Sequence, residues 1–394
     1  MPAPAGRRKV LIFVQSDAWG GMENHFLTLT LNLAATQEYW PVVAMLRLPA
    51  TAEAFDALAA RGIPVMHLSG VNDFSLRAFI KSLWWLRRIR PEIAHFMLGG
   101  PGALPCPTLA ASLLGRPFLL TEHGCFDEHI APPGVLKKWI RRWVGRRAVT
   151  TICVSNETRR RLERVYGVPA GRMVVIHNGV DLKAFDDRAS AESSSDFGSR
   201  HATRDARTPV IICVARLNAL KGHRYLVEAL SGLPDAELWL VGNGETRLDL
   251  ERQAAQSGLA CRIKFLGQRS DVPQLLRQAD VFCLPSLTEG LPLCVIEAMA
   301  ARLPVVAARV GGLTELVVEG ETGFLVEPKN PEALRDRLAR LLADPALRER
   351  MGAAGRRRVE EQFNLPTMLR RTREIYASVF QERAAGTERG AQES

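Results

Sequence analysis

Short apolar runs alternate with longer helix-like segments along nearly the whole chain, and this alternation restricts the fold more than any other feature. The first run, 9–14, is followed by a glycine-containing turn and an apolar-periodic segment from Met22 to Ala35. Continuous apolar strands separated by helices predict parallel sheets that are covered by helices on both faces. The strand candidates are 9–14, 41–46, 63–68, 92–97, 117–123, 150–155, 173–178, 209–215, 236–242, 262–267, 280–285, 304–309 and 323–328.

The alternation is interrupted once, at 186–208, where Ser, Ala, Asp and Arg replace the periodic apolar residues, as is typical of a linker. A chain of 394 residues with 47% hydrophobic residues can bury two separate cores. We therefore predict two doubly wound α/β domains, 1–185 and 209–364, joined by this linker. Residues 365–394 are predicted to form a C-terminal helix and tail that pack back on the first domain.

The formal charge of +10 is distributed unevenly along the chain. Residues 1–183 hold 23 basic and 13 acidic side chains, so this half carries the whole excess and the rest is neutral overall. The first domain is therefore expected to face an anionic partner. We do not expect that partner to be nucleic acid, because no binding module or aromatic stacking platform accompanies the arginines.

Several classes of protein are excluded by what the sequence lacks. No apolar run reaches the roughly 18 residues that a membrane span needs, and the first run is too short for the core of a signal peptide. The seven cysteines show no CxxC and no His-paired metal spacing, so we interpret them as reduced core thiols. The sequence thus predicts a cytoplasmic protein without a metal centre.

Part of the basic excess lies in an amphipathic segment at 134–147. Its apolar face holds Val135, Leu136, Trp139, Ile140, Trp143 and Val144, and its other face holds Lys137, Lys138, Arg141, Arg142, Arg146 and Arg147. Either the tryptophans lie at headgroup depth in an anionic membrane, or the apolar stripe packs on the sheet of the first domain. The first alternative would place the protein peripherally at the inner face of the cytoplasmic membrane. A second segment rich in Trp and Arg, 79–90, is interpreted as a sheet-covering helix.

Two cations follow the first strand of the second domain. Ligands of doubly wound sheets bind at the carboxyl ends of the strands. Arg216 stands directly after the run 209–215, and Lys221 follows five residues later, just before the next helix. Cations beside the free amides of a helix N-terminus predict an anion site that suits a diphosphate.

Two glutamates eight residues apart follow the run 280–285. Glu289 lies in the loop, and Glu297 lies inside the following helix on an otherwise apolar face. A carboxylate on such a face needs a partner, which is either a pair of ribose hydroxyls or a nearby arginine. Gly290 and Pro292 open the helix and leave the amides of its first residues, Leu291, Leu293 and Cys294, free for phosphate or sugar oxygens.

The stretch 288–300 resembles the E-x7-E signature of the GT-B retaining glycosyltransferases of group 1, family 4. Further motifs similar to those of this family occur in the same order along roughly residues 8–380. They are the GG-x-E loop at 20–23, the strand-end histidine at 123, N-G-V-D at 178–181, R-x4-KG at 216–222, V-G-x-G at 241–244, the base-side loop at 265–276 and the glycine pair within 308–317.

This resemblance implies a GT-B fold, in which two Rossmann-like domains face each other across a cleft. It also implies metal-independent transfer of a sugar from a nucleotide-diphosphate donor, with retention at the anomeric carbon and without a cofactor. The acceptor would be anionic, lipid-linked or a polysaccharide, in cell-envelope glycan synthesis. The catalytic residues implied are Arg216, Lys221, Glu289 and His123, and the donor-binding residues are Gly20, Gly21, Gly267, Arg269, Gly290, Leu291, Leu293 and Glu297.

In the family, residues at these positions bind different parts of the donor. Arg216 and Lys221 would neutralise the diphosphate, and Glu297 would bind the ribose. The transferred sugar would contact Glu289 and His123, the backbone near Gly267 and Arg269 would hold the base, and Gly20 and Gly21 would let the backbone approach the sugar diphosphate. Glu23 and Asp127 are named as acceptor-side candidates without assigned roles.

Three alternatives stay open at this point. The same fold supports sugar-nucleotide epimerases, although E-x7-E with R-x4-KG argues against them. It also supports phosphorylases, which would depend on inorganic phosphate or a cofactor lysine. A third alternative is a sugar-nucleotide-binding protein without transferase activity.

Overall fold

The computed structural model resolves into two compact units: unit 1 comprises Met1–His177 and Met368–Ser394, and unit 2 comprises Asn178–Thr367. The residues that the structure describes are 4–14, 20–45, 51–67, 75–99, 106–124, 134–190 and 208–392.

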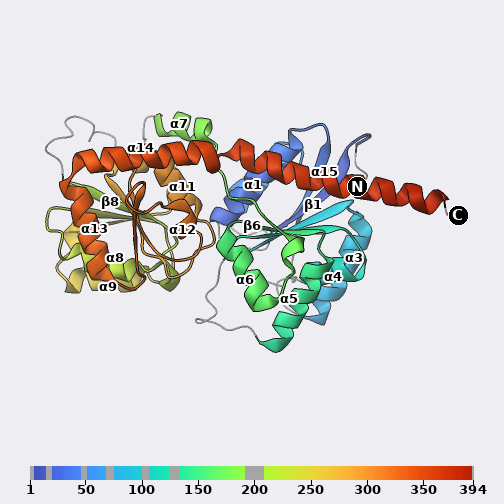
Figure 1. Cartoon of the computed structure of the whole chain (residues 1–394), viewed down its shortest axis with the longest axis horizontal. Coiled ribbons are helices and arrows are strands. Elements are labelled where there is room, and N and C mark those ends of the chain that lie inside the picture. The colour runs from blue at the N-terminus through green and yellow to red at the C-terminus, as the bar shows by residue number, and fades with distance from the viewer. Residues whose placement is uncertain are drawn as a thin grey trace. The chain divides into compact units, whose positions relative to one another are not determined.

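Unit 1 is built on a seven-stranded parallel sheet with the strand order β3-β2-β1-β4-β5-β6-β7 in the described residues (Figure 1). The strands are β1 (Arg8–Val14), β2 (Tyr39–Met45), β3 (Val65–His67), β4 (Ile93–Leu98), β5 (Phe118–Glu122), β6 (Thr150–Cys153) and β7 (Met173–Val175). The helices are α1 (Gly21–Ala34), α2 (Ala52–Ala59), α3 (Leu76–Ile89), α4 (Cys106–Leu113), α5 (Val135–Arg147) and α6 (Asn156–Tyr166), and α15 (Leu365–Gln392) returns to this unit.

Successive side chains of each buried strand point to opposite sides of the sheet of unit 1, so both of its faces are apolar. On one face, Phe96 of β4 packs with Trp85 of α3 and Val144 of α5 in one core cluster. On the other face, His95 of β4 forms a 2.7 Å hydrogen bond with the hydroxyl of Tyr376 on α15. The C-terminal helix therefore covers one face of this sheet, while α3, α4 and α5 cover the opposite face.

Unit 2 contains a six-stranded parallel sheet with the order β10-β9-β8-β11-β12-β13. The strands are β8 (Val210–Val214), β9 (Glu237–Val241), β10 (Ile263–Gly267), β11 (Val281–Leu284), β12 (Val305–Ala308) and β13 (Gly323–Val326). The helices are α7 (Leu182–Ser190), α8 (His223–Leu230), α9 (Arg247–Gln256), α10 (Val272–Gln278), α11 (Leu293–Ala300), α12 (Leu313–Leu316), α13 (Pro331–Ala343) and α14 (Pro345–Gln362).

The predicted alternation is confirmed, because each strand candidate overlaps a strand of the structure and every strand pair is parallel. No helix in the described ranges is both long and apolar enough to span a membrane. The interpretation of the cysteines as core thiols is wrong for Cys261, which is exposed.

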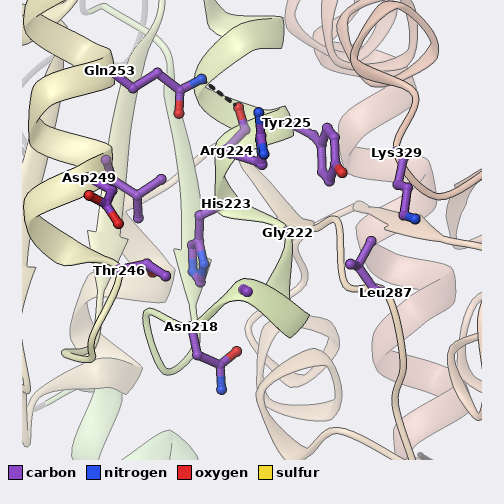
Figure 2. Close-up of a pocket in the computed structure, with 12 residues that line it drawn as sticks. Asn218, Gly222, His223, Arg224, Tyr225, Thr246, Asp249, Gln253, Leu287 and Lys329 are labelled. Carbon is purple, nitrogen blue, oxygen red and sulfur yellow. Dashed lines mark hydrogen bonds between the residues drawn. The ribbon is translucent and has the colours of Figure 1, made fainter. Parts of the chain in front are cut away.

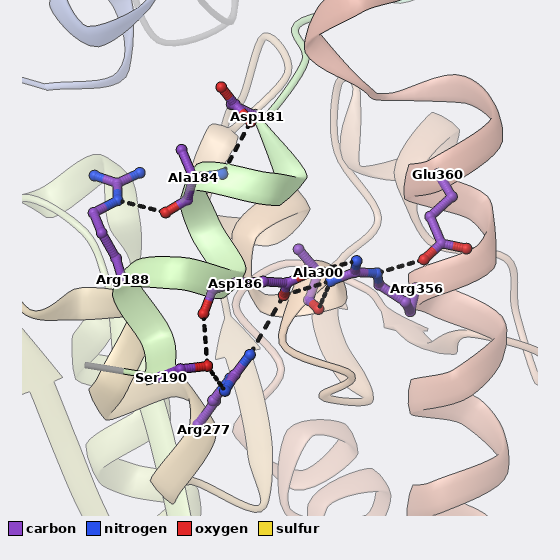
Figure 3. A network of polar contacts seen from close by, with 9 residues as sticks. All are labelled: Asp181, Ala184, Asp186, Arg188, Ser190, Arg277, Ala300, Arg356 and Glu360. Carbon is purple, nitrogen blue, oxygen red and sulfur yellow. Dashed lines mark hydrogen bonds and ion pairs between the residues drawn. The ribbon is translucent and has the colours of Figure 1, made fainter. Parts of the chain in front are cut away.

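The predicted linker 186–208 begins too early. Its first residues belong to α7, and Asp186 on this helix accepts two hydrogen bonds from Arg356 of α14, at 2.9 and 2.8 Å (Figure 3). Arg277 of α10 contacts the same carboxylate and the hydroxyl of Ser190. These contacts attach α7 to unit 2, which starts at Asn178 and not after the predicted boundary at 185.

Candidate functional site

The carboxyl ends of β8 and β11 bring together a lysine, a glutamate and a serine. Lys221 Nζ donates to Glu289 Oε1 over 2.7 Å, and Ser286 Oγ donates to the same oxygen over 2.7 Å. Glu289 is 7% exposed, and these two hydrogen-bond donors compensate the burial of its carboxylate. Burial lowers the pKa of Lys221, but the charge and the hydrogen bond of Glu289 outweigh burial and leave that pKa above its usual value. The structure thus joins two predicted catalytic residues in one ion pair.

Glycines let the loops of this site touch through their backbones. Gly222 and Gly311 both have a positive φ, +68° and +51°. A Cβ at Gly222 would overlap the carbonyl oxygen of Pro285, and one at Gly311 would overlap that of Glu289. Because these positions have no room for a side chain, the loops after β8, β11 and β12 form one packed edge. The glycines thereby fix the backbone that carries the ion pair.

Arg216 and Arg269 both belong to unit 2, but their guanidinium groups differ in exposure and in contacts. Arg216 is exposed, and its guanidinium makes no hydrogen bond or ion pair with any residue that the structure describes. Arg269 is instead bound in a bidentate pair to Asp271, at 2.7 and 2.6 Å, and the pKa of Arg269 is raised by that hydrogen bonding. Gly267 ends β10 with a φ of +66°. Of these two arginines, only Arg216 has a guanidinium without a hydrogen bond or ion pair in the described residues.

The helix α11 carries the second glutamate of the pair. Glu297 is partly buried, and its carboxylate makes no hydrogen bond or ion pair within the described ranges. Burial raises its pKa to about 7, although the charge of Arg188 acts in the opposite direction. The start of α11 is held by Asn178, whose amide donates to the carbonyl oxygen of Leu291 over 2.8 Å. This places Gly290, Leu291 and Leu293 at the free amide end of α11.

A pocket of about 680 Å³ lies beside the loop between Arg216 and Lys221 (Figure 2). Asn218 of this loop lines it, together with residues of α8 and α9 and with Gly222, Thr246, Leu287 and Lys329. His223 is buried in its wall, and burial together with the charge of Lys221 lowers its pKa to about 4. The imidazole is therefore neutral near pH 7. None of the predicted site residues lines this pocket.

In unit 1, the predicted histidine has an aromatic neighbour that the sequence analysis did not select. The ring centroids of His123 and His25 lie 4.6 Å apart, in an edge-on arrangement. Burial, followed by the nearby His25 and His95, lowers the pKa of His123 well below its usual value. The loop at the start of α1 places Gly20 and Gly21 at the surface and the side chain of Glu23, 5% exposed, inside.

Directly before His123, Glu122 forms a fully buried ion pair with Arg141 of α5. The prediction that Arg141 belongs to a cationic outer face is therefore wrong, because this side chain points to the sheet. Burial raises the pKa of Glu122 to about 7 despite the charge of Arg141. The pair links α5 to the end of the strand that carries His123.

Two predictions for this region have no test in the structure. Asp127 lies outside the described residues. Among the described residues, no three His, Cys, Asp or Glu side chains are grouped as metal ligands would be, and metal independence stays a prediction. The sequence reasoning missed Ser286, for which a hydroxyl three residues before Glu289 was the signal available. It named Asn178 only as part of the N-G-V-D motif and placed Arg141 on the wrong face of its helix.

Two family models together match most of the chain. The model described as "Glycosyl transferases group 1" matches residues 197–358, and "Glycosyltransferase Family 4" matches residues 19–184. Alpha-D-kanosaminyltransferase of Streptomyces kanamyceticus is 30% identical over 293 residues, which are 68% of this chain and 74% of that protein.

A second relative and a solved structure are similar to a larger part of the chain. The UDP-Gal:alpha-D-GlcNAc-diphosphoundecaprenol alpha-1,3-galactosyltransferase of Escherichia coli is 28% identical over 333 residues, 82% of this chain and 84% of that protein. The crystal structure of HepE from Anabaena in complex with UDP and glucose has a TM-score of 0.80 and covers 94% of this chain and 100% of its own. At 22% identity, that structure establishes the common fold.

Proposed function

The chain belongs to the group 1, family 4 glycosyltransferases with the GT-B fold, and from this membership we propose that it transfers a sugar with retention at the anomeric carbon. The donor is a nucleotide sugar. The observation that carries the finer proposal is the arrangement of Lys221, Glu289 and Ser286 at the carboxyl ends of β8 and β11. It combines a cation for a diphosphate with a buried carboxylate for sugar hydroxyls.

The electrostatics of this arrangement suit a leaving nucleoside diphosphate. An ammonium group has three donors, and Lys221 uses one of them on Glu289, so the others are available to phosphate oxygens. Arg216 adds a second cation. Charge grows on the diphosphate as the bond to the sugar breaks, and fixed cations stabilise that charge most in the transition state. We assign this role to Arg216 and Lys221 without a metal ion.

The carboxylates would position the rest of the donor. Glu289 is held by Lys221 and Ser286 through one oxygen, which leaves its other oxygen for a hydroxyl of the transferred sugar. The carboxylate of Glu297 makes no hydrogen bond or ion pair in the described residues, although the charge of Arg188 acts on it, and we assign it to the two ribose hydroxyls. No dedicated nucleophile is needed, since the acceptor hydroxyl attacks on the face that the phosphate leaves, and the leaving phosphate assists by taking its proton.

The acceptor that we propose is a lipid-linked or polysaccharide glycan of the cell envelope. The similarity to a galactosyltransferase named for a diphosphoundecaprenol-linked acceptor supports a lipid-linked acceptor. The basic excess of residues 1–183 supports an anionic one. In the same proposal, the helix at 134–147 brings the protein to an anionic membrane surface.

The anomeric outcome tests the retaining mechanism without a known acceptor. Slow hydrolysis of a UDP- or GDP-α-sugar in D2O with excess EDTA is followed by proton NMR before the free sugar mutarotates. Retention predicts that the α anomer is released first. Initial release of the β anomer would contradict the retaining mechanism, and a requirement for added metal would contradict metal independence. A protein that binds the donor but releases no sugar and no transfer product would instead be the non-enzymatic alternative.

A further inference from the structure

Exposed apolar side chains gather on one helical layer of unit 1. Among the described residues, all exposed large apolar side chains except Leu248 lie on α3, α4 or α5, and they are between 56% and 86% exposed. They are Leu76, Ile80 and Trp84 on α3, Leu113 on α4, and Val135, Leu136 and Trp139 on α5. Exposed apolar side chains gathered on one layer of helices indicate an interaction site.

The three helices form one continuous surface. In unit 1, α4 packs against both α3 and α5, and Figure 1 shows α3, α4 and α5 on one side of the sheet. Other residues of the same helices face inward: Trp85 and Leu86 of α3 and Val144 of α5 are buried in the core. The apolar residues of α3 at positions 76, 80 and 84 follow a spacing of four, so they form a second stripe that the sheet does not need.

The packing alternative for the segment at 134–147 therefore holds for only part of it. Val144 packs on the sheet, while Val135, Leu136 and Trp139 near the start of α5 are exposed. The interpretation of 79–90 as only a sheet-covering helix is incomplete, because Trp84 is exposed next to the buried Trp85.

The charged side chains of these three helices have one sign. None of the residues of α3, α4 and α5 is acidic. The exposed cations are Arg77, Lys81, Arg87 and Arg88 on α3, and Lys137, Lys138, Arg142, Arg146 and Arg147 on α5. Apolar and aromatic side chains among cations suit the interface of a bilayer that contains anionic lipid.

We propose that α3, α4 and α5 together form a docking face for an anionic bilayer, with α3 contributing as much as α5. This proposal deepens the proposed function and rests on it, because a lipid-linked acceptor requires the enzyme to work at a membrane. A second copy of the chain is a poorer occupant, since a symmetric contact would press two cationic surfaces together. Two anchoring helices fix the orientation of the sheet against the bilayer, which one helix would leave free to rotate.

The test compares variants of the full chain in vesicle sedimentation. Vesicles of phosphatidylcholine with phosphatidylglycerol are compared with phosphatidylcholine alone, at low and at high salt. We expect the α3 variant Ile80→Ser/Trp84→Ser and the α5 variant Leu136→Ser/Trp139→Ser each to weaken binding to the anionic vesicles about tenfold or more. The matched control is Leu248→Ser on α9, where an equally exposed apolar residue lies beside acidic residues and binding should not change.

Three outcomes would overturn the proposal. They are unchanged binding of the α3 variant, equal binding to phosphatidylcholine alone at high salt, and a wild-type dimer in sedimentation velocity that the α3 variant dissociates. Thermal stabilisation by nucleotide sugars, measured on the same variants without vesicles, should be unchanged. If that stabilisation is present and vesicle binding is absent, only the docking face is wrong; if it is absent in the wild type, the transferase proposal is wrong.

Discussion

Lys221→Met should lower kcat by about 10²- to 10³-fold, because it removes a fixed cation from a site where charge develops in the transition state. The variant also leaves the carboxylate of Glu289 buried with only Ser286 as a donor in the described residues, so the free energy of unfolding should fall. Rates of nucleoside diphosphate release and thermal unfolding measure the two effects.

Two further variants separate catalysis from stability. The double variant Lys221→Met/Glu289→Gln removes the unpaired charge, so it should recover stability without recovering activity. Lys264→Met is the matched control, since the Lys264 side chain is also 26% exposed and forms an ion pair with Glu237 at 2.8 Å. This ion pair does not lie at the carboxyl ends of the strands. Lys264→Met should lose stability and keep kcat. A Lys221→Met enzyme with a kcat within about twofold of the wild type would contradict the role of Lys221.

Glu297→Gln should weaken donor binding by about 10- to 100-fold at about pH 8, because a carboxylate that accepts two ribose hydrogen bonds becomes a neutral amide. The wild-type pKa of about 7 makes this difference depend on pH. As the pH falls through 7, Glu297 takes up a proton and wild-type affinity should fall toward that of the variant. Calorimetric titration of the donor across this range measures both curves.

The same raised pKa makes the contribution of Glu297 to stability change with pH in the direction opposite to that of donor affinity. The pKa of Glu297 is raised from 4.5 by burial, so its contribution to stability is present below about pH 4.5 and is lost as the pH rises through about 7. Glu297→Gln should therefore be more stable than the wild type at high pH and equal to it at low pH. Glu349→Gln on α14, where the glutamate is exposed and lies outside the first turn of the helix, should change neither quantity. A donor affinity of the wild type that is flat across pH 7 would contradict the assignment of Glu297.

Strand positions could be predicted from the sequence because burial on both faces leaves a local signal, a short run of apolar residues. The positions of Arg216 and Glu289 after strands followed from the same signal, since parallel strands end at one edge. The ion pair between Lys221 and Glu289 did not, because its partners are 68 residues apart and the contact exists only in the folded unit.

Helical periodicity alone could not show which face of a helix is buried. The helical pattern places Arg141 among the cations of the outer face. In the structure it is buried, because it forms an ion pair with Glu122 at the end of β5. Trp84 and Trp85 are neighbours in the sequence with opposite exposures. The helix α7 was not predicted for a related reason: its Asp186 is bound by Arg356, which is 170 residues away in the sequence.

Binding of a nucleotide sugar by unit 2 is tested most directly by thermal unfolding with UDP-glucose, UDP-galactose, UDP-N-acetylglucosamine and GDP-mannose. A ligand that binds only the folded state at about 100 times its Kd stabilises it by about 2.7 kcal/mol. We predict that at least one of them raises the Tm of the wild type and fails to raise that of Arg216→Ala. This variant is suitable because the exposed Arg216 side chain makes no hydrogen bond or ion pair with the residues that the structure describes. The account is contradicted if no nucleotide sugar raises the Tm, or if the same one stabilises Arg216→Ala equally.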